Sequence, residues 1–234
     1  MEALLSIDGL LSLVTLTFLE IVLGIDNIIF ISLVTQDLDP KIQPKARQIG
    51  IGLAMLFRVL MLLGITWLIG LTAPIFELGN HPVSGRDAIL FIGGVFLLAK
   101  ASTEIVKKTE GKGHVNDRKS STLVGAIIQI GLLDIVFSFD SVLTAIGMTE
   151  NIAIMIIAVV ISMGIMLVFA KPIGAYIEKH MALQILALSF LIMIGTVLIA
   201  ESAHIEIPKP YVYSSVGFAL VVQLLSIRAV SKRK

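Results

Sequence analysis

The sequence predicts an all-α membrane protein with seven transmembrane helices. Of its 234 residues, 56% are hydrophobic and only 15% are charged, and the apolar residues gather in long runs. A soluble domain carries about 25% charged residues, so this chain has too little polar surface for a water-facing shell. Inside a bilayer the backbone polar groups need internal partners, which makes helices the expected spanning elements.

Seven segments are long enough to span the hydrocarbon core, which takes about 20 mostly apolar residues. The predicted spans are 10–34, 48–71, 87–106, 122–147, 152–170, 183–202 and 211–229. Proline, glycine and charged residues punctuate the connections between them. The chain is therefore expected to cross the membrane an odd number of times, with its two termini on opposite sides.

The distribution of basic residues predicts the orientation. Arg86 and Lys209 are the only basic residues in the N-terminal tail and the loops after the second, fourth and sixth spans. The other loops and the C-terminal tail are rich in Lys and Arg. Because cytoplasmic loops carry the excess of positive charge, the N-terminus is expected outside and the C-terminus in the cytoplasm.

Two spans carry matching acidic motifs. The first span contains Glu20, then three apolar residues, Gly24, one apolar residue, Asp26 and Asn27. The fourth span repeats this order as Asp134, Ser138, Asp140 and Ser141 at the same spacing, and Gly94 to Lys100 in the third span aligns with Gly195 to Glu201 in the sixth. A repeat of three spans reverses its direction in the membrane on each copy, which predicts inverted repeats with a site near the midplane.

The predicted organisation is a single transmembrane domain over residues 1–234. Its parts are a first repeat (10–106), a cytoplasmic linker (107–121), a second, inverted repeat (122–202), and a seventh helix with a basic tail (203–234).

The intramembrane acids need compensation. A carboxylate at the bilayer centre costs about 2.5–3.5 kcal/mol on insertion scales. Arg58 is the one deep permanent cation expected beside the four acids of the motifs, so the remaining negative charge suits a divalent cation, protons, or both in exchange. Two alternatives stay open: Glu20 and Asp134 as neutral acids that hydrogen-bond between helices, and Arg58 as a structural counter-ion or as part of a gate.

The available ligands indicate which ion could bind. The chain has no cysteine, and its four histidines fall in loops or at helix ends. Oxygen donors remain, and hard oxygen sites favour Mg2+, Ca2+ or Mn2+ over Zn2+ or Cu2+. The predicted metal ligands are Glu20, Asp26, Asn27, Asp134, Asp140 and Ser141. A helix break at Gly24 and at Ser138 would turn both acids of each motif toward one site and free backbone carbonyls as further ligands.

The run from Leu19 to Phe30 and the run from Leu133 to Val142 closely resemble the TerC family of integral membrane proteins, which is named for tellurium resistance and placed with the LysE-type transporter superfamily. The resemblance covers nearly the whole chain and implies metal-ion export from a bacterial inner membrane, with manganese as the usual substrate. The acids of the family motif map onto Glu20, Asp26, Asp134 and Asp140.

The expected function is that of a secondary transporter that exports a divalent cation, foremost Mn2+, with protons as the possible counter-moving ion. The alternative is a membrane accessory protein that delivers metal to exported proteins or scaffolds a metal and tellurite stress-response complex. No prosthetic group or enzymatic activity is expected, because no catalytic or ATP-binding motif occurs. A net charge of +1 argues against a nucleic-acid partner.

Overall fold

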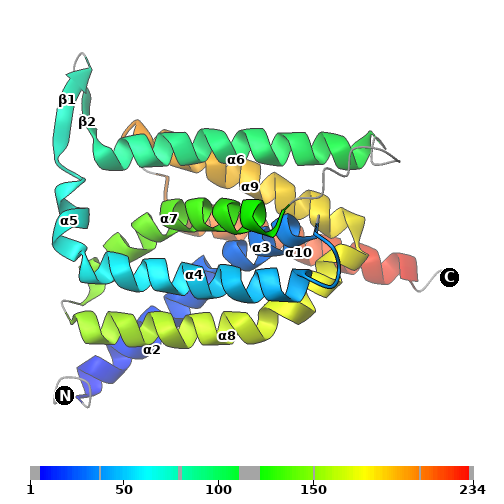
Figure 1. Cartoon of the computed structure of the whole chain (residues 1–234), viewed down its shortest axis with the longest axis horizontal. Coiled ribbons are helices and arrows are strands. Elements are labelled where there is room, and N and C mark those ends of the chain that lie inside the picture. The colour runs from blue at the N-terminus through cyan, green and yellow to red at the C-terminus, as the bar shows by residue number, and fades with distance from the viewer. Residues whose placement is uncertain are drawn as a thin grey trace. The chain divides into compact units, whose positions relative to one another are not determined.

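The computed structural model describes residues 6–36, 38–78, 81–110, 122–149, 151–205 and 207–231, and the side chains of Ile25, Asp26, Leu78, His81, Asp140, Thr144, Lys209, Val230 and Ser231 lie outside this description. Within these ranges, 7 helices are long and apolar enough to cross a membrane, which confirms the predicted all-α membrane class (Figure 1). The chain divides into two compact units, residues 1–74 with 118–176 and residues 75–117 with 177–234.

The first unit contains α2 (Ile7–Leu23), α3 (Ile25–Thr35), α4 (Gln43–Leu63), α5 (Ile65–Gly70), α7 (Leu123–Met148) and most of α8 (Ile152–Lys179). The second unit contains the hairpin β1 (Pro74–Leu78) and β2 (His81–Ser84), followed by α6 (Gly85–Thr109), α9 (Met181–Ser202) and α10 (Lys209–Ser231). Both units therefore combine segments from the two halves of the sequence.

Polar side chains set several of the helix starts. The hydroxyl of Ser6 accepts a hydrogen bond from the Gly9 backbone N–H at 3.0 Å, and Thr122 does the same for Gly125 at 3.1 Å. Ser84 and Asp87 form a capping box in which each side chain accepts from the other residue's backbone N–H. These caps satisfy backbone donors that the first turn of a helix leaves free.

Two span boundaries differ from the sequence prediction. The predicted span 48–71 ends as α4 at Leu63, because Gly64 interrupts the helix before the short α5 begins. Glycine is a weak helix former, which makes it a favourable place for this interruption. The predicted span 152–170 continues as α8 through Pro172 to Lys179. Proline is tolerated in a membrane helix where neighbouring groups satisfy the backbone carbonyl that it leaves free.

Small residues allow close helix packing in the first unit, where α4 packs along α7. An ideal Cβ placed on Gly50 would lie 3.0 Å from Ile130, and one placed on Gly131 would lie 3.2 Å from Phe57. The two glycines thus bring the helix backbones together, as small residues do in membrane bundles.

In the second unit, α6 and α9 make the closest packing through Gly94 and Gly195. An ideal Cβ on Gly94 would lie 2.6 Å from the Gly195 carbonyl oxygen, and one on Gly195 would lie 2.9 Å from the Gly94 carbonyl oxygen. The sequence aligns these two glycines as equivalent positions of its two halves. In the structure, each glycine faces the backbone carbonyl of the other.

Candidate functional site

The first acidic motif lies where its helix is interrupted. Gly24 separates α2 from α3 with φ −97° and ψ 0°, and its N–H bonds to the Ile21 carbonyl at 3.2 Å, a tighter turn than the α-helix makes. An ideal Cβ on Gly24 would lie 2.5 Å from Met166 Sδ on α8, so this position also has little room for a side chain. A helix break is thus present at Gly24, where the sequence predicts one.

The second acidic motif lies on an unbroken helix. Ser138 sits inside α7, which runs continuously from Leu123 to Met148, so the helix break predicted at Ser138 is wrong. The equivalence of Ser138 with Gly24 in the sequence therefore does not extend to the backbone, which is interrupted at Gly24 and continuous at Ser138. Ser138 keeps a small buried side chain at this level of the bundle.

A buried ion-pair network joins the two motifs. The Arg58 guanidinium on α4 donates to Glu20 on α2 and lies 3.7 Å, from Nε to Oδ1, from Asp134 on α7. The three side chains are 1%, 2% and 3% exposed, so all of them are withdrawn from solvent and lipid. Arg58 therefore lies between the first acids of both motifs and is their shared counter-ion in this structure.

The polar residues that end the motifs extend the network. Asn27 Nδ2 donates to Asp134 Oδ1 at 3.5 Å, and the Ser141 hydroxyl lies within hydrogen-bonding reach of Glu20. Asn27 and Ser141 are equivalent positions of the repeat, and each contacts the first acid of the other motif. The contacts thus cross from one half of the sequence to the other in both directions.

The network is not fully compensated. One guanidinium faces two carboxylates, which leaves one negative charge when both acids are ionised. Asp134 Oδ2, Ser138 Oγ and Arg58 Nε are buried and make no hydrogen bond with the residues that the structure describes. Buried polar atoms are paired in most proteins, so these three atoms leave hydrogen-bonding capacity unused at the centre of the network.

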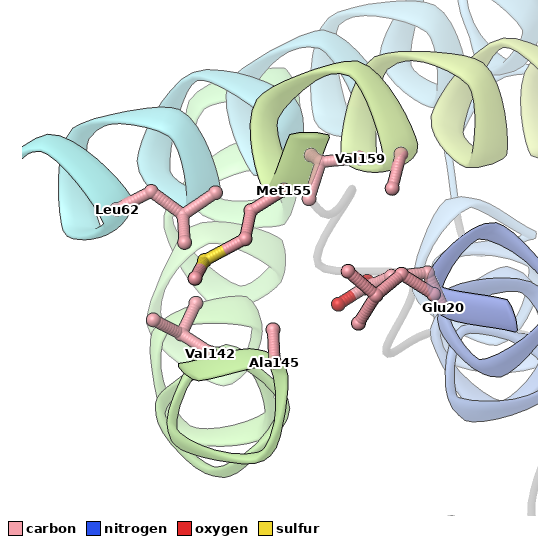
Figure 2. Close-up of a pocket in the computed structure, with 8 residues that line it drawn as sticks. Glu20, Leu62, Val142, Ala145, Met155 and Val159 are labelled. Carbon is pink, nitrogen blue, oxygen red and sulfur yellow. The ribbon is translucent and has the colours of Figure 1, made fainter. Parts of the chain in front are cut away.

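A small cavity borders the network on the Glu20 side (Figure 2). Glu20 supplies the carboxylate, which points into the cavity, and the other seven lining residues are apolar, among them Leu16, Leu62, Val142 and Met155. Leu16 lies one turn before Glu20 and Leu62 one turn after Arg58, so the cavity lies on the predicted outer side of the ion pair. Apolar side chains separate the carboxylate from this side of the bundle.

The predicted metal ligands are brought together only in part. Glu20, Asn27, Asp134 and Ser141 meet around Arg58, whereas the side chains of Asp26 and Asp140 lie outside the described residues. No group of three or more His, Cys, Asp or Glu side chains is close enough to hold a metal ion within the described ranges.

The sequence did not identify the partners of Arg58 or the contact of Met166 with Gly24. Their depth in the predicted spans places Arg58, Glu20 and Asp134 at a similar level, but depth alone does not fix how each helix is rotated about its axis. Nothing in the sequence distinguishes Met166 from the other methionines, because methionine commonly fills apolar helix faces.

Long apolar helices, with a buried ion-pair network inside the first unit, define a polytopic integral membrane protein. The chain belongs to the TerC family of integral membrane proteins, whose pattern matches residues 5–234. It is 48% identical over 223 residues to a UPF0053 protein of Haemophilus influenzae, covering 94% of each chain. It is 46% identical over 217 residues to the UPF0053 inner membrane protein YgdQ of Escherichia coli K12, covering 93% of this chain and 92% of the relative.

A longer relative carries additional sequence. The chain is 43% identical over 224 residues to the UPF0053 protein YegH of Escherichia coli K12, which covers 95% of this chain and 42% of YegH. No solved structure matches the chain. The family, the inner-membrane relatives and the seven membrane-capable helices among the described residues together identify a multi-pass protein of the bacterial inner membrane.

Proposed function

We propose that the chain is a secondary transporter that exports a divalent metal cation, with Mn2+ as the favoured substrate, through a midplane carboxylate site between two inverted repeats. Protons move in the opposite direction. The observation that carries this proposal is the buried network in which Arg58 bridges Glu20 and Asp134, the equivalent acids of the two motifs. Charged groups at this depth are costly and typically mark an ion pathway.

The arrangement of the repeats supports a site at their interface. Within the first unit, Asn27 contacts Asp134 and Ser141 contacts Glu20, so each residue that ends one motif meets the first acid of the other motif. An inverted repeat predicts such an exchange of contacts beside its two-fold axis, and inverted-repeat transporters bind their substrate at that interface.

The oxygen donors favour a hard divalent cation. Carboxylates, an amide and a hydroxyl suit Mn2+, Mg2+ or Ca2+, and we assign Asp26 and Asp140 as the remaining ligands from the sequence. Metal entering from the cytoplasm displaces protons from the carboxylates, and the two halves then open the site outward. The chain has no ATP-binding motif, so an ion gradient is the proposed energy source.

Flux into proteoliposomes tests this proposal. Vesicles loaded with a metal-sensitive dye are given Mn2+, Mg2+ or Ca2+ under an imposed pH gradient, with wild type, Asp26→Asn and Asp140→Asn compared. We expect wild type to carry Mn2+ fastest and both variants to lose flux while staying folded, because each substitution keeps shape and deletes a ligand charge. Folded wild type that carries none of the three ions under any gradient would favour the accessory role instead.

A further inference from the structure

The position of Arg58 has a consequence for metal binding. Its guanidinium contacts Glu20 and approaches Asp134, and these two side chains supply the carboxylates that the proposed transport site needs. A divalent cation bound between the same oxygens would lie within a few ångströms of a permanent positive charge. Repulsion at that distance in a buried site is strong, so metal and guanidinium cannot both occupy it.

Arg58 is also held asymmetrically. It donates directly to Glu20, but its Nε remains 3.7 Å from Asp134 Oδ1, and neither Nε nor Asp134 Oδ2 makes a hydrogen bond with any described residue. A structural arginine between two carboxylates would be expected to engage both with parallel hydrogen bonds. The contact of Arg58 with Asp134 is therefore weaker than its contact with Glu20. A competing cation would displace Arg58 most easily from Asp134.

We propose that Arg58 is a tethered cation that holds the empty site closed and that a metal ion binds only as the guanidinium withdraws from Asp134. Arg58 is then a specificity-determining residue of the proposed transport site, and this inference rests on the proposed function. A divalent ion brings enough charge to replace the guanidinium between two carboxylates. A monovalent ion such as Na+ only exchanges one positive charge for another and is excluded.

A purely structural role for Arg58 predicts the opposite response to its removal. If Arg58 only stabilises the fold, Arg58→Gln loses stability and binds metal no better than wild type. If Arg58 competes with the metal, Arg58→Gln exposes two carboxylates to the ion and binds it more tightly. Metal affinity thus separates the two roles, whereas loss of transport would not.

Equilibrium binding of radioactive Mn2+ to purified full-length protein in lipid nanodiscs is the test. We expect Arg58→Gln to bind Mn2+ at least about tenfold more tightly than wild type and to become sensitive to millimolar Na+. Arg86→Gln is the matched control. This substitution also removes one arginine charge, but Arg86 lies in the second unit beside Glu201. Its affinity should equal that of wild type.

Arg58→Lys keeps the proposal testable if Arg58→Gln fails to fold. Lysine preserves the buried charge but is a point charge without the fixed fork of arginine, so it holds two carboxylates less firmly. We expect Arg58→Lys to bind Mn2+ about threefold to tenfold more tightly than wild type. Affinity equal to or weaker than wild type in the folded Arg58 variants would overturn the tethered-cation role and leave the proposed function standing. Absence of Mn2+ binding in wild type and in every folded variant would overturn both.

Discussion

At the scale of single residues, the two carboxylates of the central network have different surroundings. Glu20 has the direct contact with Arg58 and borders the apolar cavity, whereas Asp134 has the longer contact, an amide from Asn27 and one oxygen without a hydrogen bond among the described residues. The uncompensated charge of the network therefore belongs mainly to Asp134. Glu20 and Arg58 form the closer ion pair of the network.

This difference predicts the outcome of a double-mutant cycle. Arg58→Gln leaves two buried carboxylates without their basic counter-ion and should destabilise the protein by about 3–5 kcal/mol. Adding Glu20→Gln removes one of those charges and should restore part of the loss. Thermal unfolding in detergent of both single variants and the double variant measures this coupling. A double variant no more stable than Arg58→Gln alone would show that the Glu20 contact contributes nothing to the fold.

The acids and the basic residue of this network were predicted from the sequence, but their pairing was not. Charged residues within apolar runs can be recognised in a sequence as candidate site residues, because such residues are rare in membrane spans. Which acid meets Arg58 depends on the rotation of α2, α4 and α7 about their axes, and that rotation follows from packing at positions such as Gly50 and Gly131. A single sequence does not reveal such contacts between distant segments.

At the scale of helices, glycine has two distinct uses. Gly24 ends α2 at the first acidic motif, and Gly94 and Gly195 bring α6 and α9 into backbone contact. The lengths of the spans followed from hydrophobic runs, because crossing the bilayer needs a minimum number of apolar residues. The prediction of a helix break at Ser138 was wrong, and the interruption at Gly64 was not predicted. Hydrophobicity does not indicate whether a helix is continuous.

The crossing of α6 and α9 can be tested with single methyl groups. Gly94→Ala and Gly195→Ala should each destabilise the protein by about 1–3 kcal/mol, because the added carbon overlaps the facing carbonyl. Gly164→Ala on α8 is the matched control, since an ideal Cβ there meets nothing within 4 Å. It should stabilise the helix by about 0.5–1 kcal/mol. Equal melting temperatures for all three variants would rule out the close crossing.

The apolar side chains beside Glu20 suggest a test of the path that the metal ion takes. Ala158→Leu enlarges a side chain that lines the small cavity and removes no member of the ion pair. If the cavity lies on the outward path, this variant should bind Mn2+ as wild type does and transport it at least about tenfold more slowly. Measuring binding and flux on the same preparation separates the two effects. Unchanged flux would place the path elsewhere.

At the scale of the whole molecule, each compact unit draws on both halves of the sequence. The first unit holds the ion-pair network, and the second holds the glycine crossing. A division of the sequence at the predicted linker 107–121 therefore does not coincide with the compact units. The predicted orientation in the membrane is a separate question that chemistry can settle.

The absence of cysteine makes that experiment clean, since any introduced thiol is unique. Thr72→Cys and Thr109→Cys replace exposed threonines, of which Thr72 follows α5 on the predicted outer side and Thr109 ends α6 on the predicted cytoplasmic side. A membrane-impermeant maleimide added to intact spheroplasts should label Thr72→Cys and spare Thr109→Cys until the cells are lysed. The reverse pattern would invert the orientation that the basic residues predict.

The most direct measurement of the central claim is Mn2+ flux into proteoliposomes by wild type, Asp134→Asn and Glu104→Gln. Asp134→Asn removes the uncompensated charge but keeps the Glu20–Arg58 pair, so it should fold normally. Glu104→Gln removes a carboxylate of α6 that pairs with Lys100 and Lys107 outside the first unit. The account predicts flux in wild type and Glu104→Gln and none in Asp134→Asn. Flux in Asp134→Asn as fast as in wild type, or none in wild type under any ion gradient, would contradict it.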